Sequence, residues 1–84
     1  EVPATVDARG LHPMKVGAIP EPFAALMRTQ YAIHGLLTEA YRTRSRKLLL
    51  QALLLDPCVN SIAEAEGMLD EMLELQREFL PVFK

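Results

Sequence analysis

Two polar residues, Gln30 and His34, interrupt an otherwise apolar stripe in the stretch from residue 23 to residue 43. They are four residues apart, so an amide and an imidazole would point the same way from one face of a helix. Such groups donate and accept hydrogen bonds, and are suited to the wall of a polar pocket. Arg28, on the flank of the stripe, can add a positive charge. The alternative is that these side chains are satisfied by neighbours in a core or line an interface.

The other histidine, His12, lies beside a predicted turn. We expect it to be a surface or loop residue, with a substrate-facing role as the alternative. The single cysteine, Cys58, rules out an internal disulfide and fits a reducing compartment. It has no partners at metal-ligand spacing, so we expect a buried structural thiol. We assign no catalytic, cofactor-binding or metal-ligating residue within the chain.

Two charged regions have simple interpretations. A local basic cluster at residues 42–47 is either a solvated helix end or a site for an anion or an acidic partner. Carboxylates crowd residues 64–78, but nothing in the sequence isolates two of them from water, so we expect a solvated acidic face.

The composition limits the class of protein. The 84 residues have room for one modest core, and 50% of them are hydrophobic, as in a folded chain. A net charge of −2 gives no electrostatic footprint for nucleic acid or an acidic membrane. No apolar run approaches the roughly 18 residues of a membrane span. We therefore expect a cytoplasmic protein without a nucleic-acid or membrane partner.

Periodicity and turn chemistry predict an α+β, mostly α, arrangement. Val2, Ala4 and Val6 alternate with Pro3 and Thr5, and the turn sequence at residues 7–10 follows, so residues 1–17 predict a half-buried β-hairpin with positive φ at Gly10. Pro13 weakens the second strand, and a loop is the alternative there. Residues 18–22 form a proline-rich linker, in which Pro22 suits the first turn of the following helix. Because Glu1 falls inside the first predicted strand, we expect a segment of a longer polypeptide or a processed piece.

Three helices should follow the linker. The first, at 23–43, has a stripe of apolar residues at helical spacing: Phe23, Leu26, Met27, Ile33, Leu37, Ala40 and Tyr41. The second, at 45–56, begins at the N-cap Ser45, is leucine-rich nearly all round and should be buried or at an interface. The third, at 61–80, opens with a Ser61–Glu64 capping box and carries its own stripe.

A series of short motifs, in order along almost the whole chain, resembles the C-terminal region of family 4 glycoside hydrolases. The motifs are Glu1-Val2-Pro3, Gly10-Leu11-His12-Pro13, Val16-Gly17, Ile19-Pro20, Arg28-Thr29-Gln30, Leu37-Thr38-Glu39-Ala40, residues 51–57, Leu69-Asp70-Glu71-Met72 and Phe79-Leu80-Pro81. One departure is Arg44-Ser45, where relatives usually carry Gly-Asp.

The resemblance implies a segment of a larger lactate/malate-dehydrogenase-like C-terminal domain. Enzymes of this family use NAD on a Rossmann domain and a divalent metal, usually manganese. They oxidise sugar C3, eliminate across the glycosidic bond, add water and reduce the product again. Their dinucleotide loop and metal ligands precede this region, so NAD and Mn²⁺ are implied for the full-length enzyme and not for these residues.

Three hypotheses follow from the sequence. In the first, the chain is the C-terminal part of an α-glycosidase such as an α-glucosidase, α-galactosidase or α-galacturonidase. It would supply pocket wall and subunit interface to a homo-oligomer that binds a sugar. In the second, it is a stand-alone helical module that dimerises through its leucine-rich helix. In the third, it is a small ligand-binding domain anchored by Arg28, Gln30 and His34.

Overall fold

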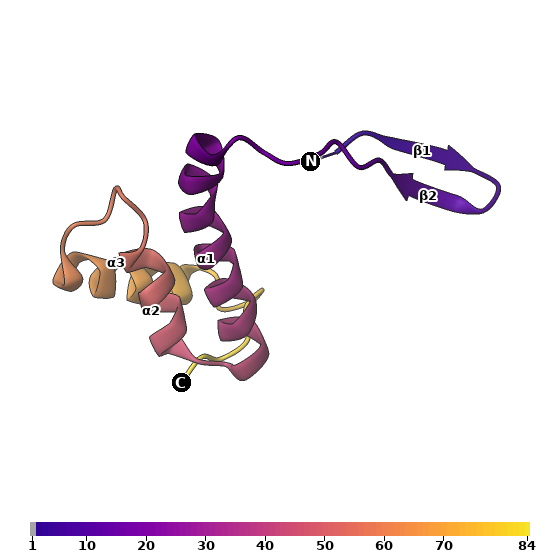
Figure 1. The fold of residues 1–84 in the computed structure, drawn as a ribbon. Helices are drawn as coiled ribbons and strands as arrows, with labels where there is room; N and C mark the ends of the chain where they lie inside the picture. Colours follow the sequence, from indigo (N-terminus) through magenta and orange to yellow (C-terminus); the bar gives the residue numbers. More distant parts are fainter. Residues whose placement is uncertain (1) are drawn as a thin grey trace.

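A computed structural model describes residues 2–84 as a two-stranded antiparallel hairpin followed by three helices (Figure 1). The elements are β1 (Ala4–Asp7), β2 (Gly10–Pro13), α1 (Glu21–Thr43), α2 (Arg46–Leu54) and α3 (Ile62–Leu75). The predicted α+β, mostly α, class is confirmed. Glu1 of the predicted hairpin lies outside the described residues.

The hairpin projects away from the helices as an arm, and we use "the arm" for residues 2–17 (Figure 1). Element contacts among the described residues run between β1 and β2, between α1 and α2, and between α2 and α3. The radius of gyration is 17.2 Å, against about 12 Å for a compact domain of this length. Both strands are exposed throughout, so the prediction of a half-buried hairpin is wrong for this chain. Nothing in the described residues packs against either face.

The turn of the hairpin has the predicted chemistry. Gly10 has φ +119°, a value that residues with a Cβ rarely adopt. The Asp7 carboxylate accepts the Arg9 backbone N–H at 2.7 Å, which closes the turn locally.

The first helix begins two residues earlier than predicted. The Pro20 carbonyl accepts the N–H groups of Phe23 and Ala24, at 3.0 and 3.1 Å. Pro22 fits the first turn because an N–H there has no partner within the helix. The helix ends at Thr43 as predicted, followed by Arg44 in the left-handed region at φ 60°.

The second and third helices are shorter than their predicted ranges of 45–56 and 61–80. Ser45 and Ser61 are confirmed as N-caps, since their hydroxyls accept the N–H groups of Leu48 and Glu64. The second helix ends at Leu54 because the chain tightens into a turn, where the Asp56 N–H donates to the Leu53 carbonyl. The third ends at Leu75, and residues 76–80 form turns that lead the chain back toward the other helices.

The last four residues hold the junction between α1 and α2 (Figure 1). The Lys84 N–H donates to the Arg44 carbonyl, and the Lys84 carbonyl accepts the Arg46 N–H, both at 2.8 Å. Phe83 packs edge-on against Tyr41, with ring centroids 6.5 Å apart. The Arg44 guanidinium lies 4.5 Å from the centroid of the same Tyr41 ring. Residue 44 therefore has contacts that help hold its left-handed conformation.

The core is small and lies among the three helices. Its buried apolar residues are Ile33, Ala40, Ala52, Ala65 and Leu69. The predicted stripe of α1 is only partly covered. Ile33 and Ala40 are buried, whereas Phe23 and Leu26 are 63% and 75% exposed. A contiguous apolar face of this kind is typical of a surface that packs against more protein.

Candidate functional site

Gln30 and His34 line one shallow open depression on α1, together with Met27 and Tyr31. Its volume is about 280 Å³, and its four lining residues come from a single helix face. Met27, Gln30 and His34 lie on successive turns of the helix, as their spacing of three and four residues predicts. Tyr31 is the lining residue that was not predicted, although its position four residues after Met27 and three before His34 places it on the same flank.

The depression combines apolar walls with two neutral polar groups. The His34 side chain is exposed, and the Thr38 hydroxyl donates to the His34 backbone carbonyl at 2.9 Å. Gln30 is also exposed. An amide and an imidazole beside Met27 and the Tyr31 ring can bind a hydroxyl-bearing ligand through both hydrogen bonds and apolar contact. One helix encloses only one side of such a ligand, so a complete pocket needs walls from elsewhere.

Arg28 points to a different partner. Its guanidinium donates to both carboxylate oxygens of Glu21, at 2.6 and 2.9 Å, along the outside of the first two turns of α1. Such a bidentate pair fixes the orientation of the guanidinium. Arg28 does not line the depression of Gln30 and His34.

His12 lies on the arm, which has no element contact with α1. Its Nε2 atom is 3.0 Å from Asp7 Oδ1, across the strand pair. Hydrogen bonds from His12 and then from the Arg9 backbone lower the pKa of the Asp7 carboxyl. The structure therefore keeps His12 apart from the other three candidate residues and gives it a partner within the arm.

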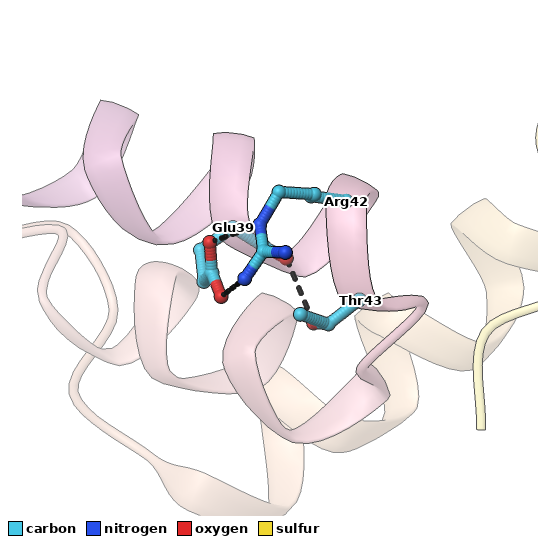
Figure 2. Close-up of polar contacts among 3 residues, drawn as sticks. All are labelled: Glu39, Arg42 and Thr43. Atoms are coloured by element: carbon cyan, nitrogen blue, oxygen red, sulfur yellow. Dashed lines mark hydrogen bonds and ion pairs between the residues drawn. The ribbon is translucent and has the colours of Figure 1, made fainter.

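The basic cluster is divided among separate partners. At the end of α1, Arg42 donates to both carboxylate oxygens of Glu39, and the Thr43 hydroxyl donates to the Glu39 carbonyl (Figure 2). The Arg42 guanidinium lowers the pKa of the Glu39 carboxyl, and Glu39 raises that of Arg42. Arg44 lies over Tyr41, and Arg46 pairs with Asp70 of α3. These arginines contact this chain's own groups and do not converge on one point.

Two other predictions concern the acidic face and the cysteine. The carboxylates on α3 and just after it are all exposed, as predicted: Glu64, Glu66, Asp70, Glu71, Glu74 and Glu78. Cys58 is also exposed, so the prediction of a buried thiol is wrong. It lies in the turn after α2, where its N–H donates to Asp56 Oδ1 at 2.9 Å.

Neither a metal centre nor a membrane span is found in residues 2–84. These residues contain no group of three or more His, Cys, Asp or Glu side chains placed to hold a metal ion. Within the same range, no helix is both long and apolar enough to cross a bilayer.

The hairpin, the three helices and the ordered motifs together are those of a C-terminal region within a longer enzyme. Residues 1–59 match the family 4 glycosyl hydrolase C-terminal domain. The chain belongs to this family.

Individual relatives share both sequence and structure with the chain. It is 38% identical to an α-glucosidase of Erwinia rhapontici over 84 residues, which is 100% of this chain and 18% of that protein. A crystal structure of a 6-phospho-α-glucosidase from gut microorganisms, in complex with NAD and glucose-6-phosphate, superposes with a TM-score of 0.88. It is 34% identical, over 100% of this chain and 19% of that one. A second such structure, with NAD and Mn²⁺, has a TM-score of 0.83 and 30% identity, over 96% and 19% of the two chains. The chain thus spans about a fifth of the length of these relatives.

Proposed function

We propose that these 84 residues form one C-terminal segment of an NAD- and Mn²⁺-dependent α-glycosidase that acts on α-glucosides or their 6-phosphates. The observation that carries the proposal is the superposition of the whole chain on a 6-phospho-α-glucosidase that contains NAD and glucose-6-phosphate. Membership of family 4 supports the same reaction class. The rest of the polypeptide, with its Rossmann domain, would be the main partner of this segment.

In this proposal the segment supplies structure and one wall of the sugar pocket. Gln30 and His34 would donate and accept hydrogen bonds to sugar hydroxyls, with Met27 and Tyr31 against the apolar face of the ring. Residues 2–84 hold no set of side chains that fits Mn²⁺. We therefore assign Mn²⁺ to the rest of the polypeptide, and NAD to its Rossmann domain. The proposed enzyme is a cytoplasmic homo-oligomer.

A hybrid enzyme tests the proposal directly. The 6-phospho-α-glucosidase that superposes on this chain serves as host in three forms. These are the full-length enzyme, the enzyme without the segment that superposes on this chain, and a hybrid in which these 84 residues replace that segment. Hydrolysis of a chromogenic 6-phospho-α-glucoside is measured with NAD and Mn²⁺. We expect the truncated host to be inactive and the hybrid to be active. A folded hybrid with no more activity than the truncated host contradicts the proposal.

Paired substitutions in the hybrid test the pocket wall. Gln30→Ala and His34→Ala each remove one hydrogen-bonding group, so each should lower kcat/KM by about tenfold. Glu66→Ala on α3 is the control, because this exposed carboxylate lies away from the depression, and it should leave kcat/KM unchanged. Equal effects at all three positions would exclude a special role for Gln30 and His34.

A second function, self-association, is favoured by a different observation. Leu36, Leu54 and Leu55 line an open, mostly apolar hollow of about 380 Å³ between α1 and α2. If the chain is a stand-alone module that dimerises there, the isolated 84 residues should sediment as a dimer, and Leu55→Glu should restore the monomer. In that case the hybrid enzyme should remain inactive.

A further inference from the structure

The pairing of the two strands fixes which backbone groups are free at each edge of the arm. Ala4 lies opposite Pro13, and Val6 opposite Leu11. The Met14 N–H donates to the Pro3 carbonyl at 2.8 Å, next to the Ala4–Pro13 pair. In an antiparallel ladder hydrogen-bonded pairs alternate with non-bonded ones, so the Ala4 and Val6 backbone groups point outward from β1. Those of Leu11 and Pro13 point outward from β2.

The two outer edges are not equivalent. The β1 edge offers two N–H donors, at Ala4 and Val6, with their two carbonyls, as an added strand requires. On the β2 edge Pro13 has no N–H, so only Leu11 can donate. Within a sheet proline is found on edge strands with its missing N–H facing outward, at the first residue of a strand, or at bulges, and Pro13 is the last residue of β2. The β2 strand is thus built as a sheet edge, whereas β1 is built as an inner strand.

The side chains of the arm show the same incompleteness. Ala4, Val6, Leu11 and Pro13 share one face because directly opposed residues lie on the same side of a sheet. Val6 and Leu11 are 75% and 68% exposed. Asp7 and His12 form their hydrogen bond on the other face. An isolated two-stranded hairpin is marginally stable in water, and independent stability takes a third strand or a packed face.

The crystal structure of the 6-phospho-α-glucosidase shows the arm within a longer polypeptide. Its superposition covers 100% of this chain at a TM-score of 0.88. Residues 18–84 make up about four-fifths of the chain, so this score also requires superposition of the arm. The arm therefore keeps its place relative to the helices in a polypeptide of which this chain spans only 19%. The other four-fifths of that polypeptide is the material available to hold it.

We propose that the outer edge of β1 pairs with an extended strand from the part of the glycosidase polypeptide that lies outside these 84 residues. The inference rests on the proposed function, since it takes the chain to be one segment of such an enzyme. Main-chain hydrogen bonds to Ala4 and Val6 hold the added strand, and the Val6 side chain forms part of the apolar face that it extends.

Proline substitutions in the hybrid enzyme test which edge is used. Val6→Pro removes an outward N–H from β1, and Leu11→Pro removes the outward N–H of its direct partner on β2. Neither N–H takes part in β1–β2 pairing, so the two variants are matched. We expect Val6→Pro to lower the activity of the hybrid by about tenfold or more, because a buried carbonyl on the added strand loses its donor. Leu11→Pro should retain most of the activity. Equal losses, or a larger loss for Leu11→Pro, would overturn the proposal.

Amide hydrogen exchange on the unsubstituted hybrid gives a readout that needs neither activity nor a tolerated proline. The Val6 N–H should exchange at least tenfold more slowly than the Leu11 N–H. In the isolated 84-residue chain both should exchange rapidly.

The outcomes separate the two proposals. An inactive hybrid that still protects Val6 would contradict the proposed function but not the strand pairing. Equal exchange at Val6 and Leu11 in an active hybrid would overturn the pairing alone. Protection of Val6 that appears in the isolated chain as its concentration rises would assign the edge to a second copy and overturn the proposal.

Discussion

The helical part and the arm are built from equally clear local signals, yet only the helical part has its own packing partners. Two serine N-caps, a small buried core and the backbone hydrogen bonds of Lys84 stabilise the helices. The arm has a well-formed turn and a regular ladder, but its strands are exposed on both faces. Local sequence thus determines which element forms, whereas the burial of an element's apolar face depends on the protein around it.

The largest expected effect is the difference in stability between a leucine-to-alanine substitution in the helical part and one in the arm. Leu69 is 5% exposed and Leu11 is 68% exposed. In the isolated chain Leu69→Ala should lower the free energy of unfolding by about 3 kcal/mol, a large share of the stability of so small a domain. Leu11→Ala should change it by less than about 0.5 kcal/mol. Urea denaturation followed by circular dichroism at the helical band measures both. Similar losses would mean that the arm packs on the helices in solution.

An intermediate effect concerns the junction that the C-terminal residues hold. Arg44 is the one non-glycine residue with positive φ in residues 2–84, and a left-handed conformation costs a residue with a Cβ about 1 kcal/mol. Arg44→Ala keeps that cost and removes the contact with Tyr41, so it should destabilise the helical part by about 1 kcal/mol. Arg44→Gly removes both the cost and the contact, so its net effect should be close to zero. Urea midpoints compare the two variants. If alanine and glycine destabilise equally, backbone strain at residue 44 has no energetic role.

Sequence reasoning found the elements because their signals are local. Ser45 and Ser61 mark helix starts through hydrogen bonds within one turn. Gly10 marks the hairpin through its own φ. The end of α3 was predicted five residues too late, because residues 76–80 turn to bring Phe83 back against Tyr41, a contact between distant parts of the chain. Contacts of that kind leave no periodic pattern.

The candidate site shows the same division. The shared direction of Gln30 and His34 follows from helical spacing alone, and the structure places both in one depression. The pairing of Arg28 with Glu21, seven residues away, required side-chain geometry that a stripe analysis does not contain. The exposure of Phe23 and Leu26 was equally out of reach, because periodicity identifies an apolar face but not the protein that covers it. The stripe describes what α1 can bury, and these 84 residues bury only part of it.

The smallest expected effect is a pH dependence confined to the arm. The pKa of Asp7 is lowered in the folded hairpin, mainly by the hydrogen bond from His12 and then by the Arg9 N–H. A lowered carboxyl pKa stabilises the folded state above the unfolded pKa of about 3.9, and this stabilisation is lost as the pH falls through the folded value. NMR shifts of the Val6 and Leu11 amides in the isolated chain should therefore show a titration step below about pH 4. Asp7→Asn should abolish that change.

The control is Glu39→Gln at the end of α1, which removes a carboxyl whose pKa is lowered by Arg42. This variant should leave the titration of the arm intact. An arm titration that responds to Glu39→Gln would show that the arm and the helices are coupled, contrary to their separate packing.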